Sequence, residues 1–209
     1  MKILNVTQGS QEWLSARMGL VTASEIDALV SPLGKVRTGE GVKTYLWRKI
    51  AEKIMNYSPD SGGTFAMNQG SLLEKTALPW FEFAHNMQVD RVGFCVSDCG
   101  RYGCSPDGMI GEESGLELKC PMPPKHLEYL AGGVVPADYI MQVQMSMFVT
   151  GRPRWIFCSY SSYLPKLVLT VERDDEAQKA IDAALNLFLS QFDAAHARLQ
   201  AMMATGGRQ

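Results

Sequence analysis

Hydrophobic and polar positions alternate along the chain in two different periods. Apolar residues spaced three and four apart, bounded by residues that suit helix ends, predict helices over about 11–18, 39–55, 71–86, 137–150 and 174–203, with another beginning at Thr22. Runs with partial alternation and β-branched or aromatic residues predict strands over 89–97, 101–110, 115–120, 154–160 and 166–172. Pro79 is expected to kink the helix in which it lies.

The order of these elements predicts the fold class. Helices come first, then a β region, then a helix, two strands and a last helix. This order is typical of an α+β fold with a central mixed β-sheet flanked by helices. The sequence contains no repeat and no long linker, so we expect a single domain over residues 1–209.

The apolar runs are short, which bears on location. No run approaches 18 apolar residues, so no membrane span is expected. The beginning of the chain, MKILNVTQGSQEW, turns polar by Asn5 and lacks the apolar stretch of a signal peptide. We therefore expect an intracellular protein.

Charge is low overall but unevenly distributed. The formal net charge of −2 argues against a protein that coats nucleic acid by bulk electrostatics. Residues 35–53 nevertheless carry six basic and two acidic side chains. This segment is either a solvated helix face or a surface that binds a polyanion.

Five cysteines occur, an odd number with no C-x-x-C pair. In a chain of this size and expected location they are predicted to be buried thiols. A thiolate or iron–sulfur site is the weaker alternative, and it would use Cys95, Cys99, Cys104 and Cys120.

The stretch GCSPDGMIGEESGLELKCP at 103–121 carries the candidate chemistry. Gly111–Gly115 supply turn residues between two strands. If the turn centres on Glu112, Asp107 lies opposite Glu117, and two facing carboxylates repel each other. A divalent cation with a preference for hard oxygen ligands, Mg²⁺ or Mn²⁺, would relieve this repulsion.

Strand periodicity adds a lysine to this pair. Glu117 and Lys119 are two residues apart and share a face, whereas Leu118 points the other way. A lysine there can position or deprotonate a water, or stabilise charge on a phosphate. The spacing alone leaves open an exposed hairpin whose charges are unrelated.

Five motifs together resemble a known family. They are CSPDG at 104–108, GLELKCP at 115–121, QVQMSMFVTG at 142–151, the pattern W-x-x-x-R-x-G-x-x-T-A-S-E from Trp13 to Glu25, and G-x-x-x-E from Gly70 to Glu74. In this order they are similar to the phage lambda-type 5′→3′ exonucleases, the YqaJ-like viral recombinase family of the PD-(D/E)xK nuclease superfamily. The resemblance implies a restriction-endonuclease-like fold.

The resemblance also implies roles for the acids and the lysine. Asp107, Glu117 and the backbone carbonyl of Leu118 would bind Mg²⁺, in a site expected to hold two ions and to accept Mn²⁺. Lys119 would be the catalytic lysine. Glu74 would add an acid from its helix, although a capping box with Ser71 is an alternative use of its carboxylate.

The glutamine motif is expected to contribute through Gln144, which would orient the water or the substrate. Gln142 is expected to be only a polar helix position. Many relatives have a tyrosine where this chain has Phe148, so that part of the motif is expected to be structural.

A second set of residues would bind the 5′-phosphate of a DNA end. The resemblance assigns this role to Arg17 and Ser24, with Ser105 nearby. Thr22 and Glu25 fit a capping box, which would place Ser24 in the first turn of a helix, where an anion is favoured. Trp13 is expected to be scaffold. The family's apolar wedge at the DNA end would correspond to Met67.

The implied function is a 5′→3′ exonuclease that degrades linear double-stranded DNA with a 5′-phosphate to mononucleotides. It would act as a ring-shaped homotrimer in the cytoplasm of a bacterial host, as a phage or prophage protein. A single-strand annealing protein would bind the remaining 3′ strand. The alternatives are a restriction-type endonuclease of the same superfamily and a non-catalytic DNA-end-binding protein.

Overall fold

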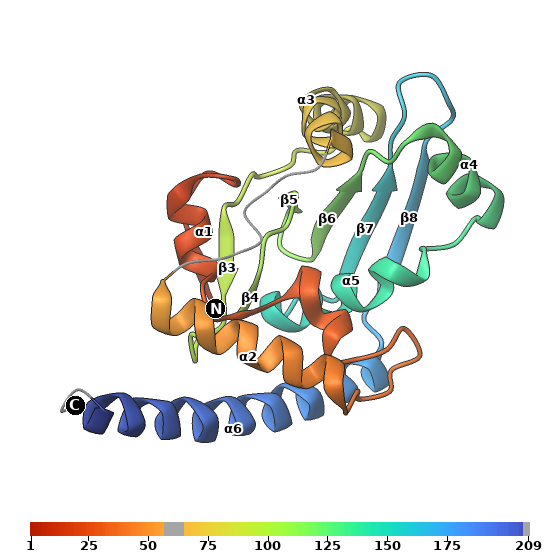
Figure 1. Ribbon diagram of the computed structural model, residues 1–209. Helices are drawn as coiled ribbons and strands as arrows, with labels where there is room; N and C mark the ends of the chain where they lie inside the picture. Colours follow the sequence, from red (N-terminus) through yellow and green to blue (C-terminus); the bar gives the residue numbers. More distant parts are fainter. Residues whose placement is uncertain (57–64, 207–209) are drawn as a thin grey trace.

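The computed structural model describes residues 1–56 and 65–206, with side chains described except those of residues 65–72 and Glu74. Figure 1 shows the arrangement of the elements. In chain order they are β1 (Lys2–Leu4), α1 (Gln11–Arg17), β2 (Val21–Thr22), the 3₁₀ helix η1 (Ala23–Ala28), α2 (Glu40–Met55), α3 (Phe65–His85), β3 (Phe94–Val96), β4 (Tyr102–Cys104), β5 (Gly108–Ile110), β6 (Ser114–Lys119), α4 (Pro123–Gly132), α5 (Ala137–Thr150), β7 (Arg154–Ser159), β8 (Leu167–Glu172) and α6 (Asp175–Gly206).

The strands form two mixed sheets flanked by helices. One has the order β1-β3-β4-β2 with β2 parallel to β4, and the other has the order β5-β6-β7-β8 with β6 parallel to β7. The α+β class, with mixed strand pairing flanked by helices, is confirmed, and the strands are divided between two sheets rather than gathered in one. The predicted strand over 101–110 is interrupted at Ser105-Pro106, and proline cannot donate to a ladder. Its two halves, β4 and β5, therefore lie in different sheets. An isolated bridge pairs Met109 of β5 with Asp90, which precedes β3 in the chain.

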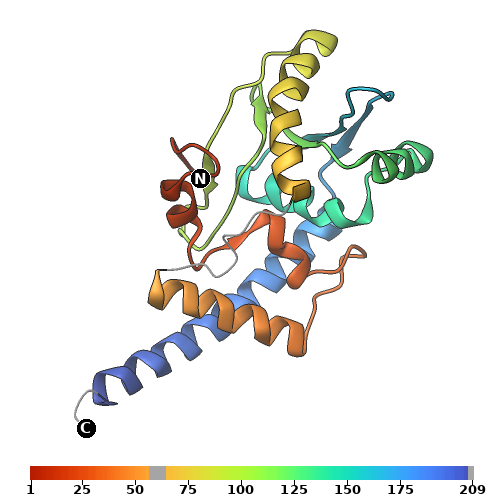
Figure 2. The same cartoon turned by 45° about the horizontal axis from the view of Figure 1, so that its top comes forward.

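Strands β6 and β7 are buried on both faces, and β7 accordingly carries the apolar run Trp155–Cys158. On one face Leu116, Leu118 and Cys158 pack with Phe81 of α3. On the other face Trp155 packs in the core that includes α5, α6 and η1. Figures 1 and 2 show α3 on one side of these strands and α5 on the other. Residues of β6 that point toward α5 are therefore enclosed by a helix.

Several elements differ from those predicted. The helix expected from Thr22 is the short 3₁₀ helix η1, and α3 begins at Phe65 and continues through Pro79. Only Phe94–Val96 of the segment 89–97 is a strand. Strands β1 and β2 were not expected because they have three and two residues, too few to show a period. Helix α4 begins with Pro123 and Pro124, a favoured place for proline at a helix start.

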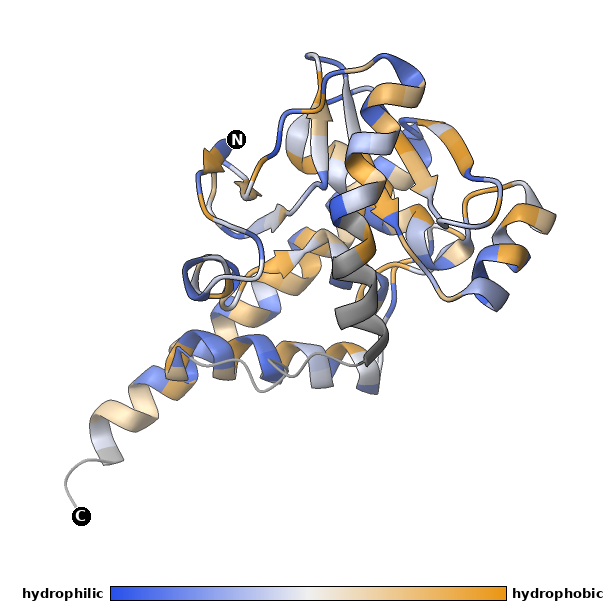
Figure 3. Ribbon diagram, turned by 90° about the horizontal axis from the view of Figure 1, so that it is seen from above, coloured by the Kyte–Doolittle hydropathy of each residue, from blue (hydrophilic) through white to orange (hydrophobic). Residues whose placement is uncertain are grey.

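Helix α6 is the longest element, with 32 residues, and its C-terminal turns extend away from the two sheets (Figures 1 and 2). Ile181 and Phe188 in its first half are buried, whereas Met202 and Met203 are more than half exposed. Figure 3 shows hydrophobic and hydrophilic residues mixed along this extended end. None of the helices in the described ranges has both the length and the apolar character needed to cross a membrane.

Candidate active site

The β5–β6 hairpin brings the two predicted acids together. Its register pairs Gly108 with Leu116 and Ile110 with Ser114, which is the register expected from a turn centred on Glu112. Asp107 directly precedes β5 and lies beside the strand residue Glu117 in this register. The backbone N–H of Leu118 donates to Asp107 Oδ2 at 2.6 Å. The Asp107 carboxylate is therefore fixed against β6 by a backbone hydrogen bond.

Glu117 is enclosed between β6 and α5. Its side chain is only 3% exposed, and Lys119 Nζ lies 2.5 Å from its Oε1. The same oxygen accepts a hydrogen bond of 2.6 Å from Gln142 Nε2 on α5. A buried carboxylate is stable only with such partners. Glu117 and Lys119 thus share a face, as the strand period predicted.

Lys119 lies between the acids and an aromatic ring. Its ammonium nitrogen is 5.1 Å from the ring centroid of Tyr139, three residues before Gln142 on the same face of α5. Burial alone would lower the pKa of Lys119, but the negative charges of Glu117 and Asp107 outweigh it and the pKa is raised. The lysine therefore carries its proton firmly in this arrangement.

Gln142, rather than Gln144, is the glutamine beside the acids. Gln144 is buried and bonds elsewhere: its Nε2 donates to Glu172 O at 2.9 Å, and its Oε1 accepts the Asp174 N–H at 3.0 Å. Two residues along a helix correspond to a rotation of about 200°, so the two glutamines point in opposite directions. The expected placement of Gln144 is wrong for this reason. Phe148 packs against Tyr102, a structural position as expected.

The three residues expected at the 5′-phosphate do come together, around Trp13. Arg17 Nη2 donates to Ser24 Oγ at 3.2 Å, and the Arg17 guanidinium lies 4.1 Å from the centroid of the Trp13 ring. Trp13 Nε1 donates to Ser105 Oγ at 2.8 Å. We call Trp13, Arg17, Ser24 and Ser105 the Arg17 cluster. Trp13 is half-buried and links residues that are about 90 positions apart in the sequence.

The helix-terminus argument for Ser24 is wrong, however. Helix η1 is a six-residue 3₁₀ helix, and Thr22 makes no side-chain cap bond. The Thr22 hydroxyl instead donates to Glu25 Oε2 at 2.9 Å. Polar character at Ser24 therefore comes from Arg17 and the hydroxyls rather than from a helix dipole.

Glu25 connects this cluster to α2. Arg48 Nη2 lies 2.8 Å from its Oε1, and Lys49 Nζ lies 2.8 Å from its Oε2. Lys49 is almost fully buried and also pairs with Glu52, whose Oε2 accepts the Gly19 N–H. Two of the six basic residues of 35–53, Arg48 and Lys49, are thus paired with acids within the fold. These two cations belong to neither a solvated helix face nor a surface that is open to a polyanion.

The cysteines do not gather into a site. Among the described residues, no group of three or more His, Cys, Asp or Glu side chains could hold a metal ion. Cys95 and Cys104 are opposite each other on β3 and β4 and are buried, while Cys99 is exposed. Burial raises the pKa of Cys158 to about 12, so this thiol is not ionised near neutral pH.

Two predicted residues cannot be placed. Glu74 lies within the bounds of α3, and so does Met67, but their side chains are outside the described part of the chain. The candidate site is therefore built from Asp107, Glu117, Lys119 and Gln142, with the Arg17 cluster joined to it through the segment Ser105-Pro106-Asp107.

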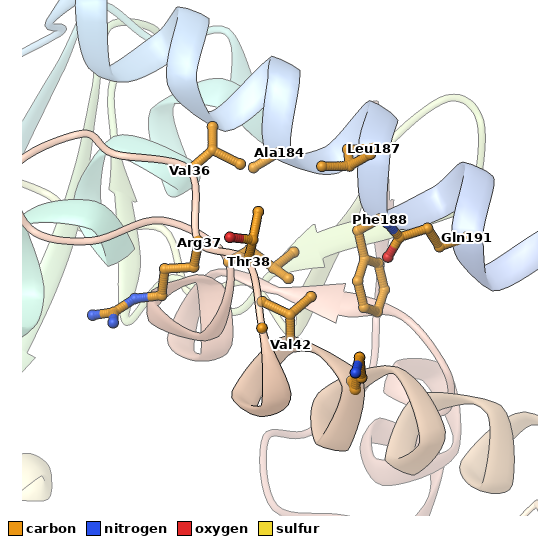
Figure 4. Close-up of a pocket in the computed structure, with 11 residues that line it drawn as sticks. Val36, Arg37, Thr38, Val42, Ala184, Leu187, Phe188 and Gln191 are labelled. Carbon is orange, nitrogen blue, oxygen red and sulfur yellow. The ribbon is translucent and has the colours of Figure 1, made fainter.

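An open cleft reaches this site. It has a volume of about 530 Å³, and Asp107 and Leu118 form part of its wall together with residues of α3 and of the segments 5–8 and 91–93. A smaller cavity of about 110 Å³ lies between residues 36–43 and α6, lined by Val36, Arg37, Val42, Leu187 and Phe188 among others (Figure 4). No acidic residue lines the smaller cavity, so the candidate chemistry belongs to the cleft at Asp107.

Sequence reasoning missed two contributors. Gln142 was read as a plain helix position, and Tyr139 was not considered. The spacing of three residues between them, which places both on one face of a helix, was the available signal.

Comparison with known proteins gives a consistent result. Residues 12–153 match the family described as the YqaJ-like viral recombinase domain. The fold is similar to LHK-Exo, an alkaline exonuclease from Laribacter hongkongensis, with a TM-score of 0.84 and 28% identity over 94% of this chain and 99% of that one; one such structure is a complex with dAMP. A phage-related exonuclease from Haemophilus somnus 129PT has the same fold, with a TM-score of 0.62 and 14% identity over 95% of this chain and 97% of that one. No curated protein matches this chain.

Proposed function

This chain belongs to the YqaJ-like viral recombinase family, and from that premise we propose that it is a metal-dependent 5′→3′ exonuclease acting on linear double-stranded DNA. One observation supports this most: a pair of acids with a lysine lies next to the Arg17 cluster in the chain, since only Pro106 separates Ser105 of that cluster from Asp107. Hydrolysis of a phosphodiester needs the first group. Recognition of a DNA end needs the second.

The donor atoms suit a hard divalent cation. Asp107 and Glu117 provide carboxylate oxygens that repel each other unless a positive charge lies between or beside them, and Lys119 alone provides one such charge. We propose that Asp107, Glu117 and the carbonyl of Leu118 hold Mg²⁺, with Mn²⁺ as a substitute, and that Glu74 contributes to a site for two ions. Bound Mg²⁺ would supply charge stabilisation at the scissile phosphate and a more acidic water.

The protein's own residues then have separate tasks. Gln142 holds the Glu117 carboxylate in one orientation. Lys119 carries a positive charge near the position where negative charge develops on the phosphate. Arg17 and Ser24 bind the terminal 5′-phosphate through charged and hydroxyl contacts, with Ser105 oriented by Trp13. The strand is cut one nucleotide from this bound end.

The product would be a deoxynucleoside 5′-monophosphate, and the uncut strand would remain as a 3′ single strand. The complex of the similar LHK-Exo contains dAMP, a molecule of this product class. We further propose that the enzyme encloses DNA as a ring-shaped homotrimer and passes the 3′ strand to a single-strand annealing protein. Sedimentation of the purified protein tests the trimer directly.

The decisive experiment compares the wild type with Lys119→Ala on linear duplex carrying a 5′-phosphate and Mg²⁺. We expect release of mononucleotides from the 5′ end and a loss of at least about 100-fold in the variant. Covalently closed plasmid should resist cleavage, whereas its cleavage would favour a restriction-type endonuclease. Equal activity of both proteins would contradict the assigned site. Tight binding of DNA ends without hydrolysis would favour an end-binding protein.

A further inference from the structure

The cleft beside Asp107 carries two cations that belong to neither the acid pair nor the Arg17 cluster. Lys75 of α3 and Arg91, between α3 and β3, both line it. On the premise of the proposed function, we propose that this cleft is a second phosphate site. It binds an internal phosphate of the DNA strand being degraded, through Lys75 and Arg91, while the Arg17 cluster holds the terminal phosphate.

The charges of the two cations are available to a ligand. Lys75 and Arg91 are exposed, and within the described residues neither forms an ion pair or a hydrogen bond through its side chain. The other cations near the site are engaged: Arg48 and Lys49 with Glu25, and Lys119 with Glu117. Unengaged cations that line one cleft are suited to phosphate oxygens.

The walls of the cleft are fixed in place. Gln8 Nε2 donates to Val92 O at 3.1 Å and to Pro106 O at 2.8 Å, which ties the segment 5–8 both to the segment 91–93 and to the residue before Asp107. Gly93 lies so close to the Val6 carbonyl that a Cβ there would collide with it. The segment carrying Arg91 is therefore held against the N-terminal segment before any ligand binds.

Shape and polarity fit a nucleotide unit of a strand. Val6, Leu78, Val92 and Leu118 give apolar surface for sugar and base edges, and Asn5 and Gln8 add amides. The volume of about 530 Å³ lies within the range of about 300–1,000 Å³ that is usual for small-molecule sites. Asp107 at one end joins the cleft to the reacting phosphate.

The terminal phosphate and the internal phosphate would be bound by two different sets of residues. None of the Arg17 cluster lines the cleft, yet Ser105 of the cluster and Asp107 of the cleft are two residues apart. A strand whose end is bound at Arg17 and whose next phosphate lies at Asp107 continues into the cleft. The phosphate at Lys75 and Arg91 is then an internal one.

Binding without catalysis tests this directly. A blunt duplex with 5′-hydroxyl ends, which lacks the terminal phosphate, is titrated in EDTA and followed by fluorescence anisotropy. We expect Lys75→Ala and Arg91→Ala each to weaken binding by about 3- to 10-fold and to lower the salt slope by about 1. Lys75→Arg should bind like the wild type.

Lys179→Ala is the matched control because Lys179 lies on α6, on the side of the molecule opposite α3, and pairs with Glu176 (Figure 1). It removes the same charge and should leave binding unchanged. Equal affinity of the Lys75, Arg91 and Lys179 variants would overturn the inference. Circular dichroism melting confirms that each variant is folded.

Cleavage assays then locate the phosphate. With Arg17→Ala we expect the preference for 5′-phosphate over 5′-hydroxyl ends to disappear, whereas Lys75→Ala and Arg91→Ala should lower kcat/KM by the same factor on both ends. A neutral methylphosphonate at the contacted linkage should remove that penalty. A penalty seen only with 5′-phosphate ends would assign the cleft to the terminal phosphate and refute the internal site. DNA binding that depends on Lys75 and Arg91, without any cleavage, would refute the proposed function but support the phosphate site.

Discussion

At the scale of single residues, Glu117 is held by two donors of different kinds. The Gln142 amide and the Lys119 ammonium both meet its Oε1 within 2.6 Å. The amide comes from a helix and the ammonium from the same strand, so the carboxylate is fixed between two elements. Groups that orient a reactive carboxylate in this way typically contribute 10- to 100-fold to metal affinity or activity.

Replacement of the two glutamines should therefore have opposite consequences. Gln142→Ala is expected to lower kcat about 10-fold or more with little change in Tm. Gln144→Ala should instead lower stability by about 2 kcal/mol, because it removes the side-chain partner of the Asp174 N–H and of the Glu172 carbonyl. Single-turnover cleavage and thermal melts measure the two effects. Loss of activity confined to Gln144→Ala would show that the contact to Glu117 is unimportant.

The ion pairs of Glu25 are expected to make the folded protein less stable at acidic pH. Burial raises its pKa, but Lys49, Arg48 and the Thr22 hydroxyl lower it more, and the net shift is downward. A carboxyl with a lowered folded-state pKa stabilises the protein above its unfolded pKa of about 4.3, and this contribution disappears as the pH falls through the folded value. We expect the Tm of the wild type to fall more steeply below about pH 5 than that of Glu25→Gln.

At neutral pH the same variant should be less stable by about 2 kcal/mol, because Lys49 keeps only Glu52 as an ionic partner. Urea unfolding at pH 7 and pH 4 gives both comparisons. Parallel pH profiles of the two proteins would contradict the role of Glu25. Lys43 and Glu40 form an exposed ion pair on α2, the helix that carries Lys49. Glu40→Gln is therefore the control, and it should change the free energy of unfolding little at either pH.

At the scale of elements, the position of the acids depends on close packing between β6 and β7. Gly115 lies opposite Trp155 in the parallel pair, and a Cβ on Gly115 would collide with the indole ring. The ring covers the glycine on the face that, two residues on, carries Glu117. The register between β6 and β7 is thus fixed by the fit between the small Gly115 and the large Trp155.

Two identical substitutions test this packing. Gly115→Ala should destabilise the protein by about 1–3 kcal/mol because the ring or the strand must move. Gly41→Ala, in the first turn of α2 with open space around it, should be neutral or stabilise by up to about 1 kcal/mol. Thermal melts of both variants decide. A stable Gly115→Ala protein would show that β6 and β7 adjust more easily than their contact implies.

Turn chemistry was the most informative feature of the sequence. Glycines and acids between two short apolar runs predicted the β5–β6 register and hence the proximity of Asp107 and Glu117. The rotation of α5 was not predictable, since both its glutamines are polar and only tertiary packing decides which one faces Glu117. The split at Ser105-Pro106 was missed because the residues on both sides favour strands. The bond from Trp13 to Ser105 could not be predicted either, because it joins distant positions that only the folded chain brings together.

At the scale of the whole molecule, attraction to DNA must be local. The net charge is −2, and Arg48 and Lys49 are neutralised by Glu25 and Glu52. Among the described residues, Lys75 and Arg91 form no ion pair and line one cleft beside Asp107. Such a distribution favours a bound strand at the site over DNA on the outer surface.

Metal binding should appear as stability of the whole chain. A cation that binds only the folded state raises the free energy of unfolding by about 2.7 kcal/mol at 100 times its Kd. We expect Tm to rise with Mg²⁺ concentration in the wild type and to change little in Asp107→Asn. Differential scanning calorimetry with and without EDTA measures this. An equal rise in both proteins would place the bound cation elsewhere.

The bond from Trp13 to Ser105 joins positions 92 residues apart, whereas the Leu118 amide reaches Asp107 across only 11. Closing a long loop costs more chain entropy than closing a short one, and distant contacts form late in folding. The acid pair should therefore become neighbours early, in a local hairpin, and the proposed DNA-end site should be completed last. A partly folded chain would then possess the proposed catalytic residues before it possesses the residues proposed to restrict cleavage to a DNA end.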